Sequence, residues 1–406
     1  MDKQFDVIVV GGGMVGATVG CALGNTSLKI GVIEQSVPVT FKLDQPHDLR
    51  VSALSKASQA IFESLAVWPG IIERRACPYK RMRVWELGDG PEFRSQDINQ
   101  SELGFIVENR ITQLALLDRL QDFDNVELIC PGKITKIDYG PDSTAIELES
   151  GRRCQTRLLV AADGGNSKVR QTVGLGVNSW DYEQQAMVLY VATEYEQQDI
   201  TWQRFVPSGP QAFLPLTGRF GSVVWYNSPD EVQRLKALPK ALLLEELMAS
   251  FPECLGAVSE VLSVASFPLK RQHALNYVKP GVALVGDAAH MINPLAGQGV
   301  NIGLLDAAAL AEVLVTAQYN GEEINSLKVL RRYESLRRNE NLKMMNVMEV
   351  FYRVFSNQVR PLQLLRNIAL GFADRFSPAR YRVMRYAMGL EGRLPKLAKG
   401  QPIIDQ

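Results

Sequence analysis

The N-terminal segment of this 406-residue chain constrains the fold most, because it joins two apolar strands through a glycine-rich turn. Residues 7–10 are all Val or Ile, and a run without polar alternation is typical of a buried parallel strand. The turn at residues 11–16 has the pattern GxGxxG and leads into an apolar helix. A second strand at residues 28–33 ends at Glu34. The sequence therefore predicts a Rossmann-like βαβ unit that binds a dinucleotide.

Each glycine of this motif has a physical role in dinucleotide binding. Gly11 permits a tight turn, Gly13 lets backbone N–H groups approach a pyrophosphate, and Gly16 lets the helix pack closely on the strand. A carboxylate at Glu34 can accept hydrogen bonds from a ribose. The unit alone leaves NAD and FAD as alternatives. The predicted site at this turn comprises Gly11, Gly13, Met14, Val15, Gly16, Glu34 and Gln35.

A second candidate segment begins with a predicted buried strand at residues 158–162. This strand runs into Asp163 and Gly164 and then into a helix. A simple strand-to-helix turn capped by Ser167 explains the same residues equally well. This segment therefore does not choose the cofactor by itself.

A third segment favours a flavin. A predicted strand at residues 280–285 ends at Gly286 and Asp287, and a Gly-Gln-Gly turn at residues 297–299 precedes an apolar helix. An aspartate at a strand's carboxyl end can accept hydrogen bonds from the ribityl hydroxyls of a flavin. The partial positive charge of a helix N-terminus suits an anionic reduced flavin ring. An ordinary NAD dehydrogenase needs none of these features, so the sequence predicts FAD.

In order and spacing, these motifs resemble those of the single-component FAD-dependent aromatic hydroxylases of the para-hydroxybenzoate hydroxylase type. More narrowly, nearly the whole chain resembles the ubiquinone-biosynthesis hydroxylases. The flavin superfamily is specified best by the segment at residues 286–301. The segments that carry the resemblance lie at residues 11–16, 50–55, 163–164, 202–205, 212–216, 286–301 and 355–357.

The resemblance implies further cofactor contacts outside the glycine-rich turn. Arg50, Val51 and Arg110 would contact the flavin or its phosphates, and Ile134 would hold the adenine through its backbone. Asp163 would organise the place where NAD(P)H acts and the pyrophosphate lies. For Arg50 and Arg110, a surface ion pair is the alternative.

The resemblance also places the flavin ring near the third segment. Asp287, next to Gly286, would bind the ribityl or phosphate region. His290 and Pro294 are the candidate catalytic residues, although His290 could instead only bond a backbone carbonyl near the flavin. The predicted lining of the isoalloxazine ring comprises Pro294, Gly297, Gln298, Gly299, Val300 and Asn301.

The activity implied by the resemblance is hydroxylation of the ring of a prenylated benzoquinol or phenol. No side chain supplies an electrophilic oxygen, so FAD would carry that step as a C4a-hydroperoxide, with NAD(P)H as reductant and O₂ as oxidant. The alternatives are an isoprenoid reductase on the same scaffold and a non-catalytic flavoprotein subunit of a lipid-handling complex. Candidate substrate residues, which could equally be sheet core, are Tyr190, Arg204, Phe205, Phe213, Leu214 and Pro215.

The expected fold is α/β, with a Rossmann-like FAD-binding domain of the glutathione-reductase type. Because three separate motifs must meet at one cofactor, this domain would be discontinuous, over residues 1–75, 103–176 and 269–340. An antiparallel β-sheet substrate domain would be inserted at residues 76–102 and 177–268, where short apolar and polar runs alternate. A helical region would follow at residues 341–406.

Composition excludes several classes of protein. Lysines and arginines number 44, as do aspartates and glutamates, which argues against a nucleic-acid binder. The three histidines are scattered, so we predict no metal. The five cysteines form no paired framework, which favours a reducing, cytoplasmic setting. We expect no signal peptide and no membrane-spanning segment.

The C-terminal region has a charge of its own. Residues 328–406 carry sixteen lysines and arginines against six acids, a surplus of ten positive charges. Apolar residues from Met344 to Phe355 recur at helical spacing within it. Such a region can lie on the inner membrane or on a partner of a ubiquinone-biosynthesis complex, or it can dock on its own core. A homo-oligomer is left open.

Overall fold

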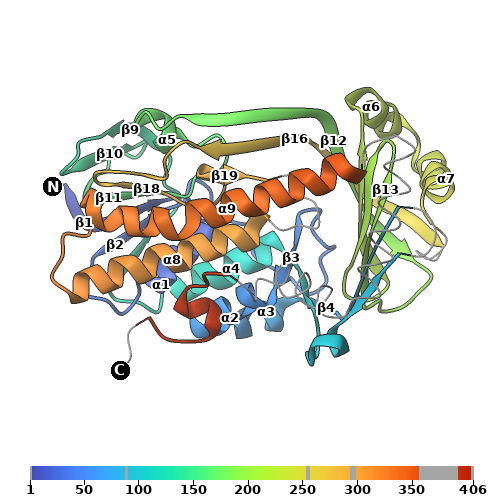
Figure 1. Ribbon diagram of the computed structural model, residues 1–406, viewed down its shortest axis with the longest axis horizontal. Helices are drawn as coiled ribbons and strands as arrows, with labels where there is room; N and C mark the ends of the chain where they lie inside the picture. Colours follow the sequence, from blue (N-terminus) through green and yellow to red (C-terminus); the bar gives the residue numbers. More distant parts are fainter. Residues whose placement is uncertain (1, 87–89, 253–256, 293–298, 356–391, 404–406) are drawn as a thin grey trace.

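The computed structural model describes residues 2–86, 90–252, 257–292, 299–355 and 392–403 (Figure 1). Two eight-stranded sheets and a layer of long helices form most of this part of the chain. The long helices lie with the first sheet in the left part of the view, and most strands of the second sheet lie in the right part. The expected α/β class is confirmed, and the second sheet is antiparallel except for one parallel pair of strands.

The first sheet is built around the N-terminal strand. Its order is β17-β18-β11-β1-β2-β8, and β1 pairs in parallel with both β11 and β2. The side chains of residues 7–10 are buried because helices cover the sheet. An antiparallel pair, β9 and β10, extends from β11. The bounds are β1 Lys3–Val10, β2 Ile30–Ile33, β8 Val126–Ile129, β9 Ile134–Asp138, β10 Thr144–Leu148, β11 Arg153–Ala161, β17 Val278–Lys279 and β18 Val282–Leu284.

The long helices pack on one another and on the first sheet. Helix α1 contacts α8 and α4, and α8 contacts α9. Although α8 is long and apolar enough to span a membrane, most of it is buried inside the protein, as expected of a core helix. The bounds are α1 Met14–Ala22, α4 Asn109–Leu120, α8 Gly299–Tyr319 and α9 Leu327–Phe355.

Smaller elements complete this half of the molecule. A three-stranded sheet has the order β3-β7-β4, and the N-terminus of α2 is capped by the Ser55 side chain, which accepts a hydrogen bond from the Ser58 N–H. The bounds are β3 Val51–Ser55, β4 Cys77–Tyr79, β7 Gly104–Glu108, α2 Lys56–Ser64, α3 Trp68–Arg74, α5 Lys168–Thr172, and the short 3-10 turns η1 Ser95–Ile98, η3 Gly286–Ala288 and η5 Lys396–Lys399.

The second sheet has the order β19-β16-β12-β15-β14-β13-β5-β6. Its neighbouring strands are antiparallel except for β13 and β5, which are parallel. Helices α6 and α7 follow β15 in the chain. The bounds are β5 Arg81–Trp85, β6 Glu92–Arg94, β12 Val177–Thr193, β13 Ile200–Val206, β14 Gly209–Pro215, β15 Phe220–Asn227, β16 Val258–Ala274, β19 His290–Met291, α6 Pro229–Ala237 and α7 Lys240–Ser250.

The two faces of this second sheet have different neighbours. Trp202, Phe213 and Trp225 belong to a buried cluster that includes residues of α6 and α7. The residues next to them along the same strands, such as Ala212 and Val224, line a cavity on the opposite face. Because side chains alternate along a strand, one face therefore forms a core with the helices, and the other faces the first half of the molecule.

Strands β12 and β16 connect the two halves. Each is seventeen residues long, and they pair with each other from Val177 and Ala274 at one end to Thr193 and Val258 at the other. Figure 1 shows this ribbon running from above the first sheet into the second. The pairing shifts register in three places, so the ribbon is continuous but not perfectly regular.

The sheets divide the chain in a way that resembles the predicted domains, and we keep those domains as a proposal. The first sheet takes its strands from residues 3–161 and 278–284. Two expected boundaries fall within continuous elements, because β16 runs through 268/269 and α9 runs through 340/341. Much of the predicted C-terminal helical region, residues 356–391, lies outside the described residues.

Candidate active site

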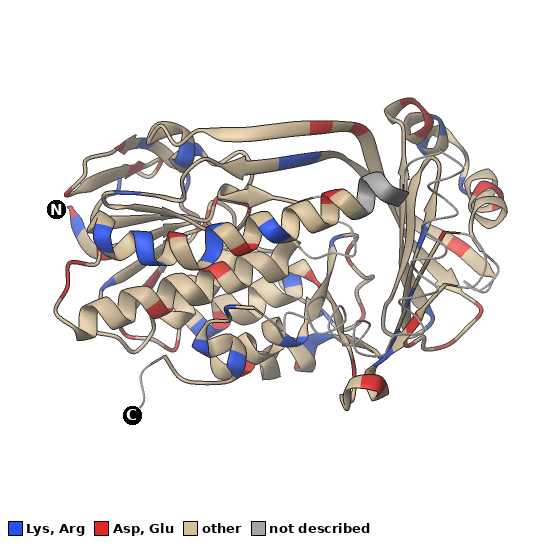
Figure 2. Cartoon of the chain, in the orientation of Figure 1, with Lys and Arg blue, Asp and Glu red and all other residues tan. Residues whose placement is uncertain are grey.

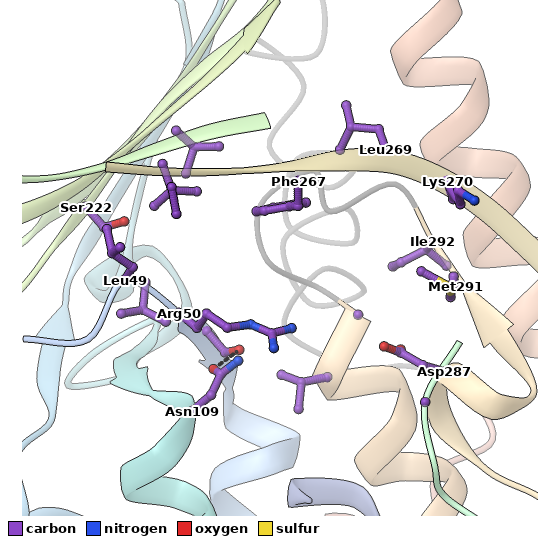
Figure 3. Close-up of a pocket in the computed structure, with 18 of the residues that line it drawn as sticks. Leu49, Arg50, Asn109, Ser222, Phe267, Leu269, Lys270, Asp287, Met291 and Ile292 are labelled. Carbon is purple, nitrogen blue, oxygen red and sulfur yellow. Dashed lines mark hydrogen bonds between the residues drawn. The ribbon is translucent and has the colours of Figure 1, made fainter. Parts of the chain in front are cut away.

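A cavity of about 720 Å³ lies between the glycine-rich turn and the second sheet. Figure 3 shows Arg50 and Asp287 on its lower side and Ser222 on the strands of the second sheet. Residues of the three predicted flavin segments line it together, among them Gly13, Gly164 and Asp287. The fold therefore brings the three sequence motifs to one place.

The glycine-rich turn has the shape that a phosphate cradle requires. Gly11 has φ +104°, and a Cβ atom there would lie 2.4 Å from the Ala162 carbonyl oxygen. A Cβ at Gly16 would lie 1.9 Å from the Gly11 oxygen, so α1 approaches the turn too closely for any side chain. These two positions therefore need glycine for packing alone.

Gly13 differs because it faces open space. It lines the cavity, and a Cβ there would meet nothing within 4 Å. Helix α1 begins directly after Gly13 without a side-chain cap, so the N–H groups of its first turn keep their hydrogen-bonding capacity. The residues present thus fit a dinucleotide pyrophosphate, which a methyl group at Gly13 would obstruct.

The Glu34 carboxylate lies beside this turn, at the end of β2. The Gly12 N–H donates to its Oε2 at 2.8 Å, and the Ser36 N–H donates to Oε1 at 3.2 Å. These bonds fix the carboxylate where a ribose of the dinucleotide could share it. Gln35 is exposed next to it.

Arg50 and Asp287 face each other across the cavity (Figure 3). Within the described part of the chain, neither side chain has an ion pair or a hydrogen bond. Burial raises the pKa of Asp287, and electrostatic interactions with His290 and Arg50 act in the opposite direction. Two unpaired groups of opposite charge suit a ligand with both phosphates and hydroxyls.

Two polar residues at the base of the cavity were not among the predicted site residues. The Ser52 Oγ donates to Asn109 Oδ1 at 2.7 Å, and both residues line the cavity beside Val51 (Figure 3). Asn109 is the first residue of α4. The sequence signal for Asn109 is that it directly precedes Arg110, a predicted cofactor residue.

The N-terminus of α8 reaches the same cavity through Gly299 and Val300. Asn301 is buried and holds this terminus in place: its Oδ1 accepts the Ser55 N–H at 2.9 Å, and its Nδ2 donates to the Ala53 oxygen at 2.8 Å. Asn301 thus fastens α8 to β3, which brings the positive end of the helix dipole to the cavity. Predicted residues Pro294, Gly297 and Gln298 lie outside the described residues.

The Asp163 side chain organises the start of α5. It accepts hydrogen bonds from Ser167 Oγ at 2.5 Å and from the Val169 N–H at 3.2 Å. Arg170 is buried there and donates to the carbonyl oxygens of Ala288 and Gly165, each at 2.8 Å. The Asp163 segment is therefore tied to the Gly286 segment by Arg170, whereas the Asp163 carboxylate bonds within its own segment.

A buried polar network lies behind Gly286 and Asp287. Asp306 is fully buried in α8, and its carboxylate accepts hydrogen bonds from His290 Nε2 at 2.5 Å and the Gly286 N–H at 3.2 Å. Arg337 Nε and Asn341 Nδ2, both on α9, donate to its other oxygen at 2.9 Å. Burial alone would raise the pKa of Asp306, but His290 and Arg337 outweigh burial and lower it to about 2.

This network places His290 behind the cavity wall. The His290 side chain is 1% exposed and is not among the described residues that line the cavity. It bonds a carboxylate, not the backbone carbonyl considered as the alternative. The sequence signal for this network is Asp306, which with Glu312 is one of two acids in a mostly apolar helix.

Two predicted cofactor residues lie away from the described cavity lining. The Arg110 guanidinium pairs with Asp48 at 2.8 and 2.9 Å, which raises the pKa of Arg110, and it also bonds the Val39 and Thr40 oxygens. The alternative of an ion pair therefore describes Arg110 in this structure. Ile134 begins β9 and packs against the main core.

The predicted substrate residues divide between several environments. Leu214 lines the cavity, whereas Phe213 packs on the opposite face, with α6 and α7. Arg204 also points to that face, because its Nη2 donates to the Ser250 oxygen of α7 at 2.6 Å. Tyr190 and Phe205 belong to other buried clusters. Leu214 is therefore the one predicted substrate residue in the described cavity lining; the others, including Pro215, are absent from it.

The residues of the second sheet that do line the cavity are mostly small or apolar. Val188, Ala212, Leu214 and Val224 form much of this wall. Gln203, between Trp202 and Arg204 on β13, is a polar exception that the sequence analysis missed. No signal within β13 distinguishes Gln203 in the sequence, because Thr201 and Arg204 on the same strand are polar too.

Comparison with known proteins agrees with this geometry. Residues 138–347 match a family model described as an FAD binding domain. The chain is 41% identical over 390 residues to 3-demethoxyubiquinol 3-hydroxylase of Escherichia coli K12, covering 96% of this chain and 100% of that protein. It is 37% identical to the ubiquinone hydroxylase UbiL of Rhodospirillum rubrum, covering 99% and 94%, and 33% identical to the human mitochondrial ubiquinone biosynthesis monooxygenase COQ6, covering 95% and 93%.

Solved structures share the fold at lower sequence identity. p-Nitrophenol 4-monooxygenase PnpA of Pseudomonas putida superposes with a TM-score of 0.79 at 19% identity, covering 97% of this chain and 100% of that one. PqsL of Pseudomonas aeruginosa gives a TM-score of 0.77 at 20% identity, covering 90% and 100%.

Proposed function

The chain belongs to the FAD-dependent hydroxylases of ubiquinone biosynthesis, and from that premise we propose that it hydroxylates the ring of a prenylated benzoquinol or phenol, consuming NAD(P)H and O₂. One observation carries the proposal. A single cavity joins the uncapped cradle at Gly13 to an apolar wall of the second sheet. A cofactor and an aromatic ring can therefore lie in contact within one cavity.

When bound, FAD supplies the redox chemistry, because it takes a hydride from NAD(P)H and activates O₂ for transfer of one oxygen atom to the ring. The residues fitted to hold it are the first turn of α1 for the pyrophosphate, Glu34 for a ribose, and Arg50 and Asp287 for phosphates and hydroxyls. The N-terminus of α8 would stabilise negative charge on the cofactor.

The second sheet has a different task, which is to orient the ring and exclude water. Val188, Ala212, Leu214 and Val224 present apolar surface to the cavity. A dry wall keeps an activated oxygen from being lost to solvent, and a fixed ring lowers the entropic cost of the transfer. His290 is 1% exposed, so we assign it the positioning of Asp287 through Asp306. Pro294, outside the described residues, remains a candidate for contact with the flavin ring.

The test is turnover in labelled dioxygen. Purified protein with FAD is assayed for NADPH and NADH oxidation, with and without a short-chain 2-prenyl-3-methyl-6-methoxy-1,4-benzoquinol. We expect the quinol to stimulate oxidation and the product to carry one labelled oxygen. An unlabelled, hydrogenated product would identify an isoprenoid reductase. Bound FAD without stimulation by the quinol would identify a non-catalytic flavoprotein subunit.

We further propose that the C-terminal region brings the enzyme to the inner membrane or to a ubiquinone-biosynthesis complex. Figure 2 shows lysines and arginines along α9. Its apolar residues divide: Met344 and Met348 pack against the protein's own core, whereas Val347 is 40% exposed. Cosedimentation of the full chain with anionic vesicles, compared with neutral ones, tests the membrane contact. Gel filtration with light scattering tests for a homo-oligomer.

A further inference from the structure

Gln203 occupies an unusual position in the wall of the second sheet. Its neighbours on β13 point to the opposite face, where Trp202 packs with α6 and α7 and Arg204 bonds Ser250 of α7. Alternation along the strand therefore directs Gln203 to the cavity, which it lines. The side chain is 8% exposed, so it is almost fully enclosed.

The side chains in line with Gln203 across the sheet are all apolar. Gln203 pairs with Ala212, Ala212 with Val224, Val224 with Val188, and Val188 with Ala265. All five residues line the cavity. Gln203 is thus the polar end of an otherwise apolar row that runs along one wall of the cavity.

The amide of Gln203 is unpaired among the residues that the structure describes. Among the described residues, no side-chain hydrogen bond to it is formed, and its nitrogen and oxygen remain open to the cavity. Buried amides are normally paired, since removal from water without a new hydrogen bond is unfavourable. A ligand that fills the cavity can provide the missing partner.

The chemistry of the wall limits what this ligand can be. An amide both donates and accepts, which suits a neutral hydroxyl or ether oxygen. Of the described residues of the second sheet that line the cavity, Lys270 alone is charged, so the wall around Gln203 suits a neutral substituent better than a carboxylate. Ser222 also lines the cavity, and its buried Oγ has no hydrogen-bond partner in the described chain.

We propose that Gln203 binds an oxygen substituent of the substrate ring, a hydroxyl or methoxy group, and so fixes the ring's orientation on the apolar wall. This inference rests on the proposed function, because it takes the ring of a quinol as the occupant. It makes Gln203 a specificity-determining residue. A ring without that oxygen would leave the amide unpaired and bind more weakly.

The test uses the holoenzyme and the variant Gln203→Met, which keeps the length of the side chain and removes the amide. Ring binding is measured by the change in absorption of the bound flavin, and turnover by labelled product, both with the short-chain methoxyquinol. We expect the dissociation constant and KM to rise about tenfold, the size of one neutral hydrogen bond. The dissociation constant for FAD should stay unchanged.

Stability separates this role from a structural one. Because the amide is unpaired without substrate, Gln203→Met should unfold at the same temperature as the wild type or higher. Gln121→Met, at an exposed glutamine of the α4 C-cap, is the control and should change none of these quantities. A second variant, Gln203→Leu, should repeat the loss of ring binding.

Two failures are distinguishable. Wild-type protein that binds the quinol without forming labelled product would reject the proposed function. Gln203→Met protein that binds the quinol within twofold of the wild type, or that unfolds at a clearly lower temperature, would overturn the role of Gln203.

Discussion

Replacement of Arg337 by methionine tests the buried network that supports the cavity from behind. The Arg337 side chain is 4% exposed and its Asp306 partner 0%. In the variant, Asp306 keeps His290 and Asn341 but loses a buried positive charge. Removal of one partner from a buried ion pair costs about 3–5 kcal/mol, because the remaining charge is left in a poorly hydrated site.

The same helix provides a matched control. Arg332 also pairs with a carboxylate, Glu322, through two hydrogen bonds, but these side chains are 39% and 27% exposed. A surface pair of this kind contributes about 1 kcal/mol or less. Arg332→Met should therefore be nearly neutral, although both variants remove one arginine from α9.

The assay is urea unfolding followed by tryptophan fluorescence, combined with FAD binding measured by flavin fluorescence. We expect Arg337→Met to lower the free energy of unfolding by about 3–5 kcal/mol. FAD should also bind more weakly, since Asp306 holds the Gly286 N–H next to Asp287. Adding Asp306→Asn should restore part of the stability, because both charges are then removed. Equal losses in Arg337→Met and Arg332→Met would refute this reasoning.

Further predictions concern the cradle, the cavity and acid stability. Gly13→Ala should weaken FAD binding at unchanged stability, because its methyl group enters open space. Gly16→Ala should destabilise the protein itself, since a Cβ there lies 1.9 Å from the Gly11 oxygen. Thermal unfolding without FAD distinguishes the two effects. Asp287→Asn should raise the Kd for FAD by roughly 10- to 100-fold, the loss of a charge-assisted hydrogen bond, and an unchanged Kd in a fluorescence titration would contradict its assignment. The pKa of Asp306 is lowered from 3.8 to about 2, so its contribution is complete above pH 4 and is lost as the pH falls toward 2. This pH-dependent part of the free energy of unfolding is roughly 2 kcal/mol, and it should be missing from acid unfolding curves of Asp306→Asn.

The sequence predicted the cofactor motifs because their physical reasons are local. A tight turn at Gly11 and an aspartate at the end of a buried strand follow from residues that lie next to each other in the chain. The partners of long polar side chains are not local. Arg110 could equally serve a flavin phosphate or Asp48, and only the folded chain shows that it binds Asp48.

The wall of the second sheet was harder to predict because both faces are buried. Phe213 and Leu214 are both apolar, so hydropathy cannot tell which of them faces the cavity. If the pairing register of a strand shifts by one residue, every side chain of that strand moves to the opposite face of the sheet. For the same reason, the sequence predicted Arg204 as a substrate residue, whereas in the structure its neighbour Gln203 faces the cavity.

The ribbon of β12 and β16 restricts how the enzyme can open. Two paired strands resist bending across their ladder far more than a single-chain linker does, so the two halves cannot separate like the lobes of a hinged clamp. Flexing is easiest where the pairing is irregular, between Asp181 and Gln185, where Glu183 has φ +53°. We therefore expect a bulky product to leave by sliding along the wall of the second sheet while both halves stay joined.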